Sequence, residues 1–464
     1  MRELEVLDMF CGAGGTSTGV SQACDALGIK LRLTGINHDE LSIDTHTWNH
    51  PSSRHFQENL DSLDPRVLYK NRRLNILMAS PECTNHSVAK GGRPRLDQSR
   101  ATAFHVLRWA EALCPDGILV ENVKEFQDWG PLIQKVDKKG KPVLTEEGDP
   151  WLIPDPDRKG EIFQSWLLCL RSLGYYVSYA VVNCANYGDA TTRERFFLLG
   201  SREKQLVFPK YTHMQKGESD TDLWVPAKDI IDWEYPSQSI FNRKRPLKPK
   251  TIARIVKGFE RQITPDTQGM LEPFLVILRG ASQSRGLNIP LPTITSGGGH
   301  FGLVEPFLTI LRGTGTTRDV ERPLPTITAN GNHLGLVQPF VLGQQSMASA
   351  RPVSSPIPTI STKGAISLIE PFLIGYYGNS SPYSIDKPMA TIPTKDRFGL
   401  VSSIGFDVMF RMLQPHELSA ATSFPTDYHF CGNKGDTVKQ IGNAVPVKTA
   451  QALCTCLIEQ IRAA

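Results

Sequence analysis

The sequence contains no apolar run close to the roughly 18 residues that a membrane-spanning helix requires, so we expect no membrane segment. Its first residues, MRELEVLDMFCGAGG, also lack the basic and then apolar pattern of a secretory leader. A phosphate loop of the GxxxxGK[ST] type is missing from the glycine-rich turn in this stretch, which disfavours a nucleotide triphosphatase. These absences predict a cytoplasmic protein without membrane attachment.

Cysteine is too sparse and too irregularly spaced for a disulfide scaffold or a zinc site. The nine cysteines are an odd number, and Cys454 and Cys456 are too close together for the usual zinc-ligand spacing. Free thiols in a reducing compartment are the simplest explanation. We therefore expect no metal site.

Neither sign of charge dominates, because 51 Lys and Arg residues stand against 47 Asp and Glu residues, for a net charge of +4. This balance permits nucleic-acid binding without requiring it, since a basic signal is informative only where it is clustered. With 40% hydrophobic and 21% charged residues, the composition is that of an ordinary globular protein. The length of 464 residues predicts two or three domains.

Over residues 1–204, short apolar segments alternate with segments of helical periodicity. This alternation predicts an α/β fold with a doubly wound, mostly parallel, Rossmann-like sheet. A Pro-, Gly- and Lys-rich insert at about 127–160 interrupts the pattern and is expected to form a hairpin or loop. The expected strands are 4–10, 31–37, 74–80, 117–123, 175–182 and 195–200, and the expected helices are 20–26, 99–113 and 161–173.

A repeat fills most of residues 205–405. A motif Glu-Pro-Phe-Leu, or a close variant, recurs at steps of 33, 33 and 32 residues, at 272–275, 305–308, 338–341 and 370–373. A second landmark, PLPTIT or a related hexapeptide, follows each copy, at 290–295, 323–328, 356–361 and 388–393. Short Thr-, Ile- and Val-rich runs between Gly and Pro favour strands and turns. We therefore expect four stacked β units of about 33 residues each, followed over 406–464 by helical segments.

Four short motifs in the first 204 residues carry chemistry. Asp8-Met-Phe-Cys-Gly-Ala-Gly-Gly15 is a glycine-rich turn between a strand and a helix, where the backbone can approach a ligand closely. Ser80-Pro-Glu-Cys83 follows a strand at the edge where open α/β sheets place their sites. Glu121-Asn-Val123 ends another strand, and Arg193-Glu-Arg195 places two arginines on one side of a strand. Singly, each motif also fits a bland interpretation: a tight turn, a buried thiol, a helix cap or a charged surface.

Together and in this order, the motifs resemble those of the DNA cytosine-5 methyltransferase family. Two motifs near the C-terminus strengthen the resemblance, namely RMLQPHELS (411–419) with Phe424-Pro425, and QIGNAVP (440–446). The resemblance leaves unmatched mainly the 127–160 insert and the 205–400 segment. It implies a catalytic domain over 1–204 that 406–464 completes, and a smaller β-rich target-recognition domain over 205–405.

The resemblance implies a catalytic set of Cys83, Glu121, Arg193 and Arg195. Cys83 would add as a thiolate to carbon 6 of a flipped-out cytosine in double-stranded DNA, so that carbon 5 can attack the methyl group of S-adenosylmethionine. Glu121 would bind ring nitrogen 3 and the exocyclic amine, and Arg195 would hold the ring oxygen. Arg193 would orient the groups around Glu121. The implied enzyme is a DNA (cytosine-5-)-methyltransferase.

The resemblance also implies a binding site for S-adenosylmethionine. Phe10 would pack on the adenine, the backbone of 12–15 would cradle the methionine part, and Asn443 would close the site from the far end of the chain. The full expected set is Phe10, Gly12, Ala13, Gly15, Asn37, His38, Asn59, Leu60, Asn443 and Val445.

The sequence departs from the family pattern at four positions. Glu82 stands before the nucleophile where the family has Pro, and a carboxylate there works against thiolate formation. Thr191 replaces the Gln of the arginine motif. Asn37 and Asn59 stand where the family has acids for the ribose and the adenine, and a neutral acceptor is weaker than a carboxylate. Weaker cofactor binding or a modified S-adenosylmethionine donor would follow. Lys90 is the nearest cation for an acidic donor, although a phosphate contact also explains it.

Double-stranded DNA is the expected partner. The glycine-rich loops at 296–300 and 329–333 either approach bases and phosphates or are plain hairpin turns. A cluster of basic residues near an expected helix favours contact with DNA phosphates more strongly than these loops do. Its members are Arg243, Lys244, Arg245, Lys248, Lys250, Arg254 and Lys257.

Two alternatives to this function stay open. An RNA cytosine methyltransferase would not need so large a repeat-filled segment. A catalytically silent DNA-binding protein would not need the four catalytic residues, although Glu82 leaves room for it. We expect a monomer, with room for a cognate restriction endonuclease that acts separately.

Overall fold

The structure is a computed structural model, and it describes the chain in segments. The described residues are 3–82, 101–146, 148–216, 220–240, 244–248, 251–252, 255, 274–277, 284–294, 301–305, 307–310, 317–319, 334–336, 340–343, 350–352, 366–367, 372–375, 383–384, 398–401 and 409–463. Several predicted features lie outside the described residues: Cys83, Lys90, the loops at 296–300 and 329–333, and Arg243, Lys250, Arg254 and Lys257 of the basic cluster.

The chain divides into two compact units. The first, here called the sheet unit, comprises Met1–Asp232, Asn288–Gly299 and Gln414–Ala464. The second, the repeat unit, comprises Trp233–Leu287 and His300–Leu413.

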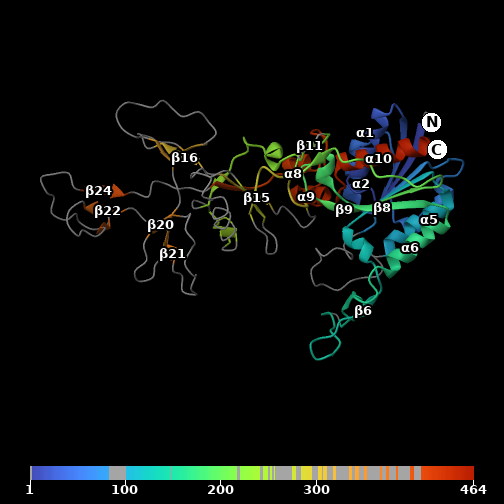
Figure 1. The fold of residues 1–464 in the computed structure, drawn as a ribbon, viewed down its shortest axis with the longest axis horizontal. Coiled ribbons are helices and arrows are strands. Elements are labelled where there is room, and N and C mark those ends of the chain that lie inside the picture. Colours follow the sequence, from blue (N-terminus) through green and yellow to red (C-terminus); the bar gives the residue numbers. More distant parts are fainter. Residues whose placement is uncertain are drawn as a thin grey trace. The chain divides into compact units, whose positions relative to one another are not determined.

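The sheet unit is built on a seven-stranded sheet of order β3-β2-β1-β4-β5-β9-β8 (Figure 1). The strands from β3 to β5 are parallel, and β9 runs antiparallel to both of its neighbours. This arrangement confirms the predicted doubly wound, mostly parallel α/β sheet. The strands are β1 (Glu3–Met9), β2 (Lys30–Asn37), β3 (Arg54–Gln57), β4 (Ile76–Ala79), β5 (Gly117–Asn122), β8 (Tyr176–Asn183) and β9 (Glu194–Ser201). The sequence pattern misses only β3 among these seven, because Arg-His-Phe-Gln has no apolar run.

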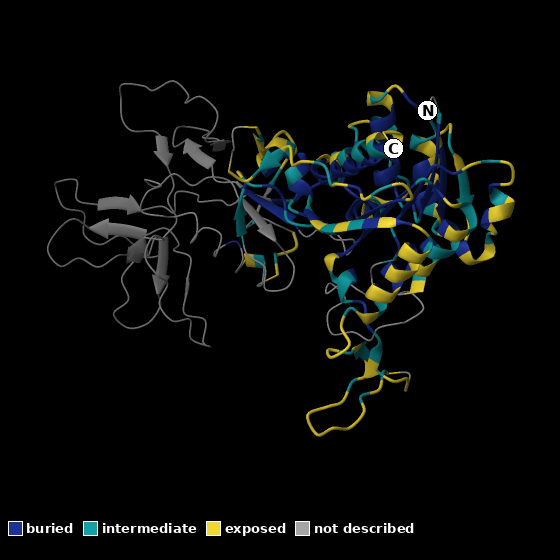
Figure 2. Cartoon of the chain, turned by 45° about the vertical axis from the view of Figure 1, so that its right-hand side comes forward, coloured by how far each residue is buried: buried dark blue, intermediate teal, exposed yellow. Residues whose placement is uncertain are grey.

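Helices cover both faces of this sheet, which explains why its strands are apolar at consecutive positions. Neighbouring residues of β1 point to opposite faces, with Val6 in one hydrophobic cluster and Leu7 in the other. Helices α5 (Phe104–Leu113) and α6 (Glu161–Ser172) pack in the Leu7 cluster, and α1 (Gly15–Ala26) and α10 (Val447–Arg462) pack in the Val6 cluster. Figure 2 shows the resulting buried centre of the unit.

The remaining elements of the sheet unit are each ten residues long or shorter. The α-helices are α2 (Glu40–Asn49), α3 (Pro65–Leu68), α8 (Pro415–Ala421) and α9 (Lys434–Asn443). The 3-10 helices are η1 (Leu60–Ser62), η3 (Ala101–Ala103), η4 (Lys124–Asp128), η5 (Cys184–Tyr187) and η6 (Ala227–Ile230). Strands β10 (His213–Met214) and β11 (Asp222–Leu223) form a parallel pair. Within the described segments, no helix is long and apolar enough to cross a membrane.

The insert predicted at about 127–160 contains an antiparallel hairpin of β6 (Leu132–Gln134) and β7 (Leu152–Pro154). It projects from the sheet unit beyond α6 (Figure 1), and its described residues over 131–154 are exposed or half-buried (Figure 2). Of the two expected forms, hairpin or loop, the structure has a hairpin.

Two glycines explain how the C-terminal helix packs against α1. A Cβ atom at Gly15 would lie 2.2 Å from the carbonyl oxygen of Val445, and one at Gly19 would lie 2.5 Å from the Cβ of Ala450. Residues four apart lie on the same face of a helix, so these glycines form one flat surface on α1. The start of α10 fills that surface.

In the repeat unit, each sequence repeat forms a three-stranded antiparallel sheet whose central strand begins at the Phe of the Glu-Pro-Phe-Leu motif or its variant. The four sheets have the orders β14-β13-β15, β17-β16-β18, β20-β19-β21 and β23-β22-β24, and the first sheet also takes up β25 and β12. The strands of the first sheet are β13 (Phe274–Ile277), β14 (Ser284–Gly286), β15 (Phe301–Glu305), β12 (Gln238–Ser239) and β25 (Met409–Met412). Those of the others are β16 (Phe307–Ile310), β17 (Thr317–Asp319), β18 (Leu334–Leu336), β19 (Phe340–Gly343), β20 (Ala350–Pro352), β21 (Ile366–Ser367), β22 (Phe372–Gly375), β23 (Tyr383–Ser384) and β24 (Phe398–Val401).

Candidate active site

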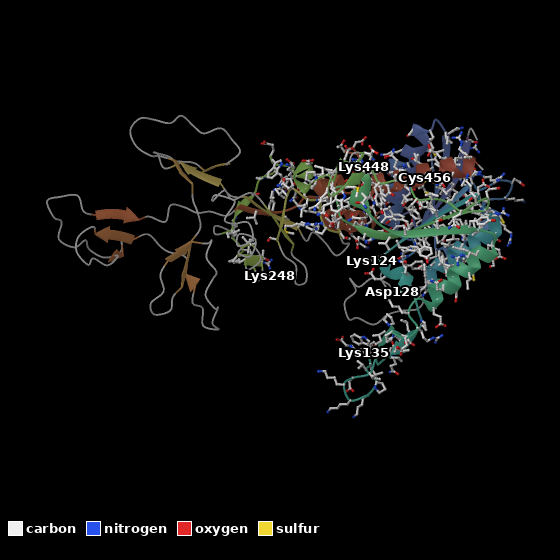
Figure 3. The ribbon with its side chains drawn as sticks, viewed as in Figure 1. Lys124, Asp128, Lys135, Lys248, Lys448 and Cys456 are labelled. Atoms are coloured by element: carbon white, nitrogen blue, oxygen red, sulfur yellow. The ribbon has the colours of Figure 1, made fainter. Side chains whose placement is uncertain are left out.

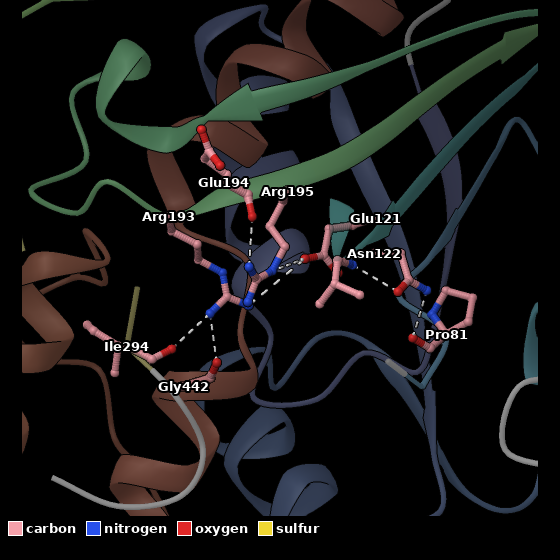
Figure 4. A network of polar contacts seen from close by, with 9 residues as sticks. Pro81, Glu121, Asn122, Arg193, Glu194, Arg195, Ile294 and Gly442 are labelled. Atoms are coloured by element: carbon pink, nitrogen blue, oxygen red, sulfur yellow. Dashed lines mark hydrogen bonds and ion pairs between the residues drawn. The ribbon is translucent and has the colours of Figure 1, made fainter. Parts of the chain in front are cut away.

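A buried carboxylate and two arginines meet at the end of β5. Glu121 is 7% exposed, and its Oε1 lies 3.3 Å from Nε of Arg195 and 3.9 Å from Nη2 of Arg193 (Figure 4). Strand β9 pairs with β5 and carries Arg195, and Arg193 lies directly before β9 begins, so both arginines reach the end of β5. The predicted residues Glu121, Arg193 and Arg195 are thus brought together.

Burial dominates the electrostatics of Glu121. Desolvation raises the pKa of its carboxyl group above the ordinary value, while the charges of Arg195 and then Arg193 lower it. The net direction is upward. The carboxyl group therefore holds a proton more readily than a solvent-exposed glutamate does.

Arg193 is held chiefly by main-chain carbonyl groups. Its Nη1 donates to the carbonyl oxygen of Gly442 at 2.7 Å and to that of Ile294 at 3.2 Å (Figure 4). The side chain is 3% exposed. Arg193 thereby joins three segments that are distant in the sequence: the arginine motif, the 288–299 segment and the end of α9.

The segment around Ile294 packs on the arginine motif through its backbone. Leu291 forms a parallel bridge with Thr191, and its amide donates to the carbonyl oxygen of Ala190 at 2.8 Å. Thr191, which stands where a Gln was expected, is fully buried and donates its hydroxyl proton to the carbonyl oxygen of Pro292. This segment is the first PLPTIT landmark, so one part of the first repeat belongs to the sheet unit.

Asn122, the residue after Glu121, is hydrogen-bonded to the segment just before the predicted nucleophile. The Asn122 side chain donates to the carbonyl oxygen of Pro81 at 3.3 Å and accepts from the amide of Val123 at 2.8 Å. Pro81 is buried, and Glu82 next to it is half-buried. Cys83 itself is outside the described residues, so the described contacts reach to within two residues of it.

The glycine-rich turn after β1 has three residues in the left-handed region of backbone conformation. Phe10, Gly12 and Gly14 have positive φ angles of 58°, 52° and 86°, which turns the chain from β1 into α1. A Cβ atom at Gly12 would approach only the carbonyl oxygen of Phe10, at 4.0 Å. Phe10 is half-buried, with its ring 6.3 Å from that of His105. The Gly12 side of the turn is therefore open, whereas Gly15 is covered by Val445.

The residues expected after β2 and β3 lie beside this turn. The amide of Cys11 donates to Ile36 and the amide of Glu58 donates to Asn37, at 3.2 and 3.0 Å, which aligns the three strand ends. Asn37 is 9% exposed, and its side-chain oxygen already accepts from the amide of Asp39. His38 is exposed.

The next pair of expected residues caps the short helix η1. Asn59 is its exposed N-cap, and Leu60 is buried with its carbonyl oxygen bound by Arg108. Together with Asn37 and His38, these residues lie at the carboxyl ends of adjacent strands.

The far end of the chain joins the two halves of the site. Asn443 is the exposed last residue of α9, next to the Gly442 that Arg193 binds. Val445, two residues later, packs its backbone on Gly15. The connection from α9 to α10 therefore runs from the Glu121 cluster to the glycine-rich turn.

A buried polar network beneath the glycine-rich turn was not predicted from the sequence. Ser17 donates to Oδ2 of Asp8 at 2.7 Å, and Nε2 of His46 lies 2.8 Å from the Ser17 hydroxyl. The other His46 nitrogen lies 2.8 Å from Nε2 of His55. The only sign of this network in the sequence is a set of three histidines within ten residues. Two of them, His46 and His50, are four residues apart and share one face of α2.

Burial controls the protonation of this network. Desolvation raises the pKa of Asp8 to about 7 and lowers the pKa of His46 well below its usual range. It also lowers the pKa of His50, which lies 3.2 Å from the Thr18 hydroxyl, to about 4. The histidines are therefore neutral near pH 7. Over the described ranges, no group of three or more His, Cys, Asp or Glu side chains could hold a metal ion.

Comparison with known protein families gives a match over most of the chain. A family profile described as C-5 cytosine-specific DNA methylase matches residues 4–130, 155–268 and 347–459. It covers most of the chain and leaves out the projecting hairpin.

Individual relatives are more distant. The chain is 24% identical over 273 residues to the Type II methyltransferase M1.BsuMI of Bacillus subtilis (strain 168), covering 56% of each protein. It is 26% identical over 267 residues to the Type II methylase M.HgiDII of Herpetosiphon aurantiacus, covering 54% of this chain and 64% of the relative. The chain thus spans less than two thirds of the length of these relatives.

A solved structure supports the fold alone. A crystal structure of a Spodoptera frugiperda DNMT2 mutant matches with a TM-score of 0.51 and 12% identity, covering 98% of this chain and 99% of that one.

Proposed function

The chain belongs to the C-5 cytosine-specific DNA methylase family, and on that premise we propose that it methylates carbon 5 of cytosine in double-stranded DNA. The observation that carries the proposal is the buried Glu121 with Arg195 3.3 Å away at the carboxyl edge of the sheet. This pair offers a hydrogen-bonding acid and a cation within the reach of a single pyrimidine ring.

Glu121 binds the ring edge that carries nitrogen 3 and the exocyclic amine. Its raised pKa suits this role, because a carboxyl group that holds a proton can donate it to nitrogen 3 as electrons move onto that atom. Arg195, which is nearer to the solvent than Arg193, binds the ring oxygen. The two groups thus stabilise the charge that a nucleophile at carbon 6 creates.

Cys83 is the nucleophile in this proposal. Its thiolate forms a bond to carbon 6, and the displaced electron pair makes carbon 5 nucleophilic. After carbon 5 has accepted the methyl group, a base removes the proton from carbon 5, and the freed electron pair re-forms the ring double bond as the bond between sulfur and carbon 6 breaks. Because carbon 6 is stacked within the duplex, the cytosine must first be flipped out. The bond from Asn122 to Pro81 supports a fixed start for the segment that carries Cys83.

The methyl donor in this proposal is S-adenosylmethionine, which supplies an electrophilic methyl group when bound. The residues at the strand ends fit such a ligand. The space beside Gly12 is open, and the amides of Gly12 and Ala13 donate no hydrogen bond to the described part of the chain. Phe10, Asn37, His38, Asn59 and Leu60 would hold its adenosine part.

Gly15 would contribute to this site mainly by seating Val445, and Asn443 would close it. The DNA-facing role of the 205–405 segment stays a prediction. A monomeric state and a separately acting restriction endonuclease stay predictions as well.

A trapping experiment tests the proposal. The protein is incubated with methyl-labelled S-adenosylmethionine and duplex DNA that contains 5-fluorocytosine, from which a base cannot remove the proton that ordinary cytosine carries. We expect a labelled covalent complex that disappears in Cys83→Ser and persists in Cys114→Ser, a matched control at an exposed thiol. The absence of both a complex and any label on ordinary DNA would refute the proposal. Sequencing of methylated DNA would then identify the target site.

A further inference from the structure

The projecting hairpin is a feature of this chain that the family profile does not match. We call residues 131–154 the arm; they fill the gap between the matched ranges 4–130 and 155–268. The arm begins ten residues after Glu121, past β5 and η4, so its root lies at the carboxyl edge of the sheet.

The root of the arm is firmly held by the sheet unit. Trp129 is 2% exposed and packs against Phe126 in an aromatic cluster, and its carbonyl oxygen accepts the amides of Ile162 and Phe163 at 2.9 and 3.0 Å. A Cβ atom at Gly130 would lie 2.1 Å from the carbonyl oxygen of Arg158. The arm therefore leaves the sheet unit from a fixed base.

The arm divides into two turns at a three-way junction. The amide of Lys135 donates to Trp151, that of Trp151 to Val143, and that of Val143 back to Lys135, at 2.8, 3.0 and 2.8 Å. The Lys135 ammonium also lies 4.9 Å from the centre of the Trp151 ring. This closed ring of hydrogen bonds fixes where the two turns start.

The two turns have the same backbone. In the first, the amide of Asp137 donates to Lys141 and that of Gly140 to Asp137, and in the second Thr145, Asp149 and Gly148 repeat both bonds. Gly140 and Gly148 have φ angles of 79° and 89°. Each turn is closed by a bridge, Val136 to Pro142 and Leu144 to Pro150. The sequences VDKKGKP and LTEEGDP are thus two copies of one turn.

The copies differ in charge. The first carries Lys138, Lys139 and Lys141, all exposed, and the second carries Glu and Asp at the equivalent positions. In Figure 3 the arm is found by its labelled residue Lys135. Within the described ranges, none of these three lysines forms an ion pair. At the root, by contrast, Lys159 pairs with Asp128 and Arg158 pairs with Glu161. The free positive charge of the arm is therefore concentrated at one tip.

We propose that the lysine turn of the arm binds backbone phosphates of duplex DNA that flank the target cytosine. This inference rests on the proposed function, since it takes DNA as the substrate that reaches the edge with Glu121. Lysines without ion pairs on a rigidly rooted hairpin suit phosphates, because the contact needs charge and reach but no base readout. The acidic turn keeps the rest of the arm away from the backbone by repulsion.

The length of the arm sets which phosphates it meets. Seven extended residues from the root to the lysine turn span about 20 Å. At a rise of 3.4 Å per base pair, this reach corresponds to roughly six base pairs. A duplex that extends about four base pairs on each side of the target would therefore escape the arm, and one that extends about fifteen would meet it.

The test compares two variants on these two duplexes. The first replaces Lys138, Lys139 and Lys141 by Gln, and the matched control replaces Glu146 and Glu147 by Gln and Asp149 by Asn in the twin turn. Both keep Asp137, Thr145 and the two glycines, so the turn backbone is retained. Binding is measured as a function of salt concentration, and methyl transfer is measured on the short duplex.

On the long duplex at about 50 mM salt, we expect the lysine variant to bind about tenfold or more weakly. Its plot of log affinity against log salt should be shallower by about 3, one unit for each lost phosphate contact. The control should bind as tightly as the unmodified protein or more tightly, and all three proteins should agree on the short duplex.

Equal binding of the long duplex by all three proteins would overturn the proposal. The proposal would also be overturned if the unmodified protein formed a dimer that the lysine variant does not form, while both proteins bound DNA equally. The arm would then act in self-association only. Failure of the proposed function is separate, because it would appear as no methyl transfer to the short duplex by the unmodified protein.

Discussion

The Nη1 of Arg193 lies 2.7 Å from the carbonyl oxygen of Gly442, a residue 249 positions further along the chain. The same nitrogen reaches Ile294 at 3.2 Å, whereas the nearest contact of Arg193 with Glu121 is 3.9 Å. Arg193 thus donates to the backbones of two distant segments. Arg195, by contrast, is directed at Glu121.

This difference predicts separate consequences for the two arginines. Arg193→Lys loses the planar group that serves two carbonyl oxygens at once, and we expect the free energy of unfolding to fall by about 2–4 kcal/mol. Arg195→Lys keeps the charge beside Glu121, so we expect a loss of stability below about 1 kcal/mol with a large loss of methyl transfer. Urea unfolding and single-turnover kinetics measure both. Equal losses of stability would show that the contact with Gly442 has no special weight.

Helix propensity and side-chain packing predict opposite changes in stability for Gly19→Ala. Helix propensity alone predicts that Gly19→Ala stabilises α1 by about 1 kcal/mol. The Cβ position at Gly19, however, is 2.5 Å from the Cβ of Ala450, so we expect α10 to be displaced and stability to fall by about 1–3 kcal/mol. Ser21→Ala, at a half-buried position of the same helix, serves as the control. A more stable Gly19→Ala protein in thermal unfolding would contradict the packing of α10 described here.

Asn122→Asp tests whether the hydrogen bond from Asn122 to Pro81 positions the catalytic segment. Aspartate keeps the acceptor for the amide of Val123 but, when ionised, has no proton to donate to Pro81. We expect turnover to fall about 10- to 100-fold, because small displacements of a reacting group are costly. Asn75→Asp is the control, since Asn75 is also buried but lies at the opposite end of the sheet. If both variants retain normal turnover per folded molecule, the tether to Pro81 has no role in catalysis.

Stability should depend on pH through His50. Its folded pKa of about 4 lies below the unfolded value of about 6.5, so below pH 6.5 the unfolded chain takes up a proton that the folded chain resists. Stability from this group is complete above pH 6.5 and falls as the pH drops toward 4, by up to about 3 kcal/mol. His50→Gln should therefore gain stability relative to the unmodified protein across this window. Parallel curves of unfolding free energy against pH for the two proteins would contradict the lowered pKa of His50.

Asp8 should show the opposite sign. Its folded pKa of about 7 is above the ordinary value of 3.8, so the folded chain retains a proton that the unfolded chain releases. Stability from this group is complete below pH 3.8 and is lost as the pH rises to 7. We expect Asp8→Asn to become more stable than the unmodified protein as the pH increases through this window. The same titration series measures it, and a constant difference between the two proteins would refute it.

The sequence by itself predicted the α/β fold, six of the seven strands of the main sheet and an insert that forms a hairpin or loop. These are local properties, since apolar runs and turn residues depend on near neighbours. Strand β3 escaped because its sequence is polar and it lies at the edge of the sheet. The family and its motifs were also identified from the sequence, because their order and residue types are written in the chain.

Only the tertiary structure decided which distant residues contact one another. It assigned Arg193 to the carbonyl oxygens of Gly442 and Ile294, Gly15 and Gly19 to the packing of α10, and Asp8 to a buried histidine network. Every residue type carries a backbone carbonyl group, and a glycine in the sequence does not reveal what packs against it, so no sequence pattern predicts such contacts. The distances between Glu121 and its arginines likewise follow from the pairing of β5 with β9, which brings together residues more than seventy positions apart.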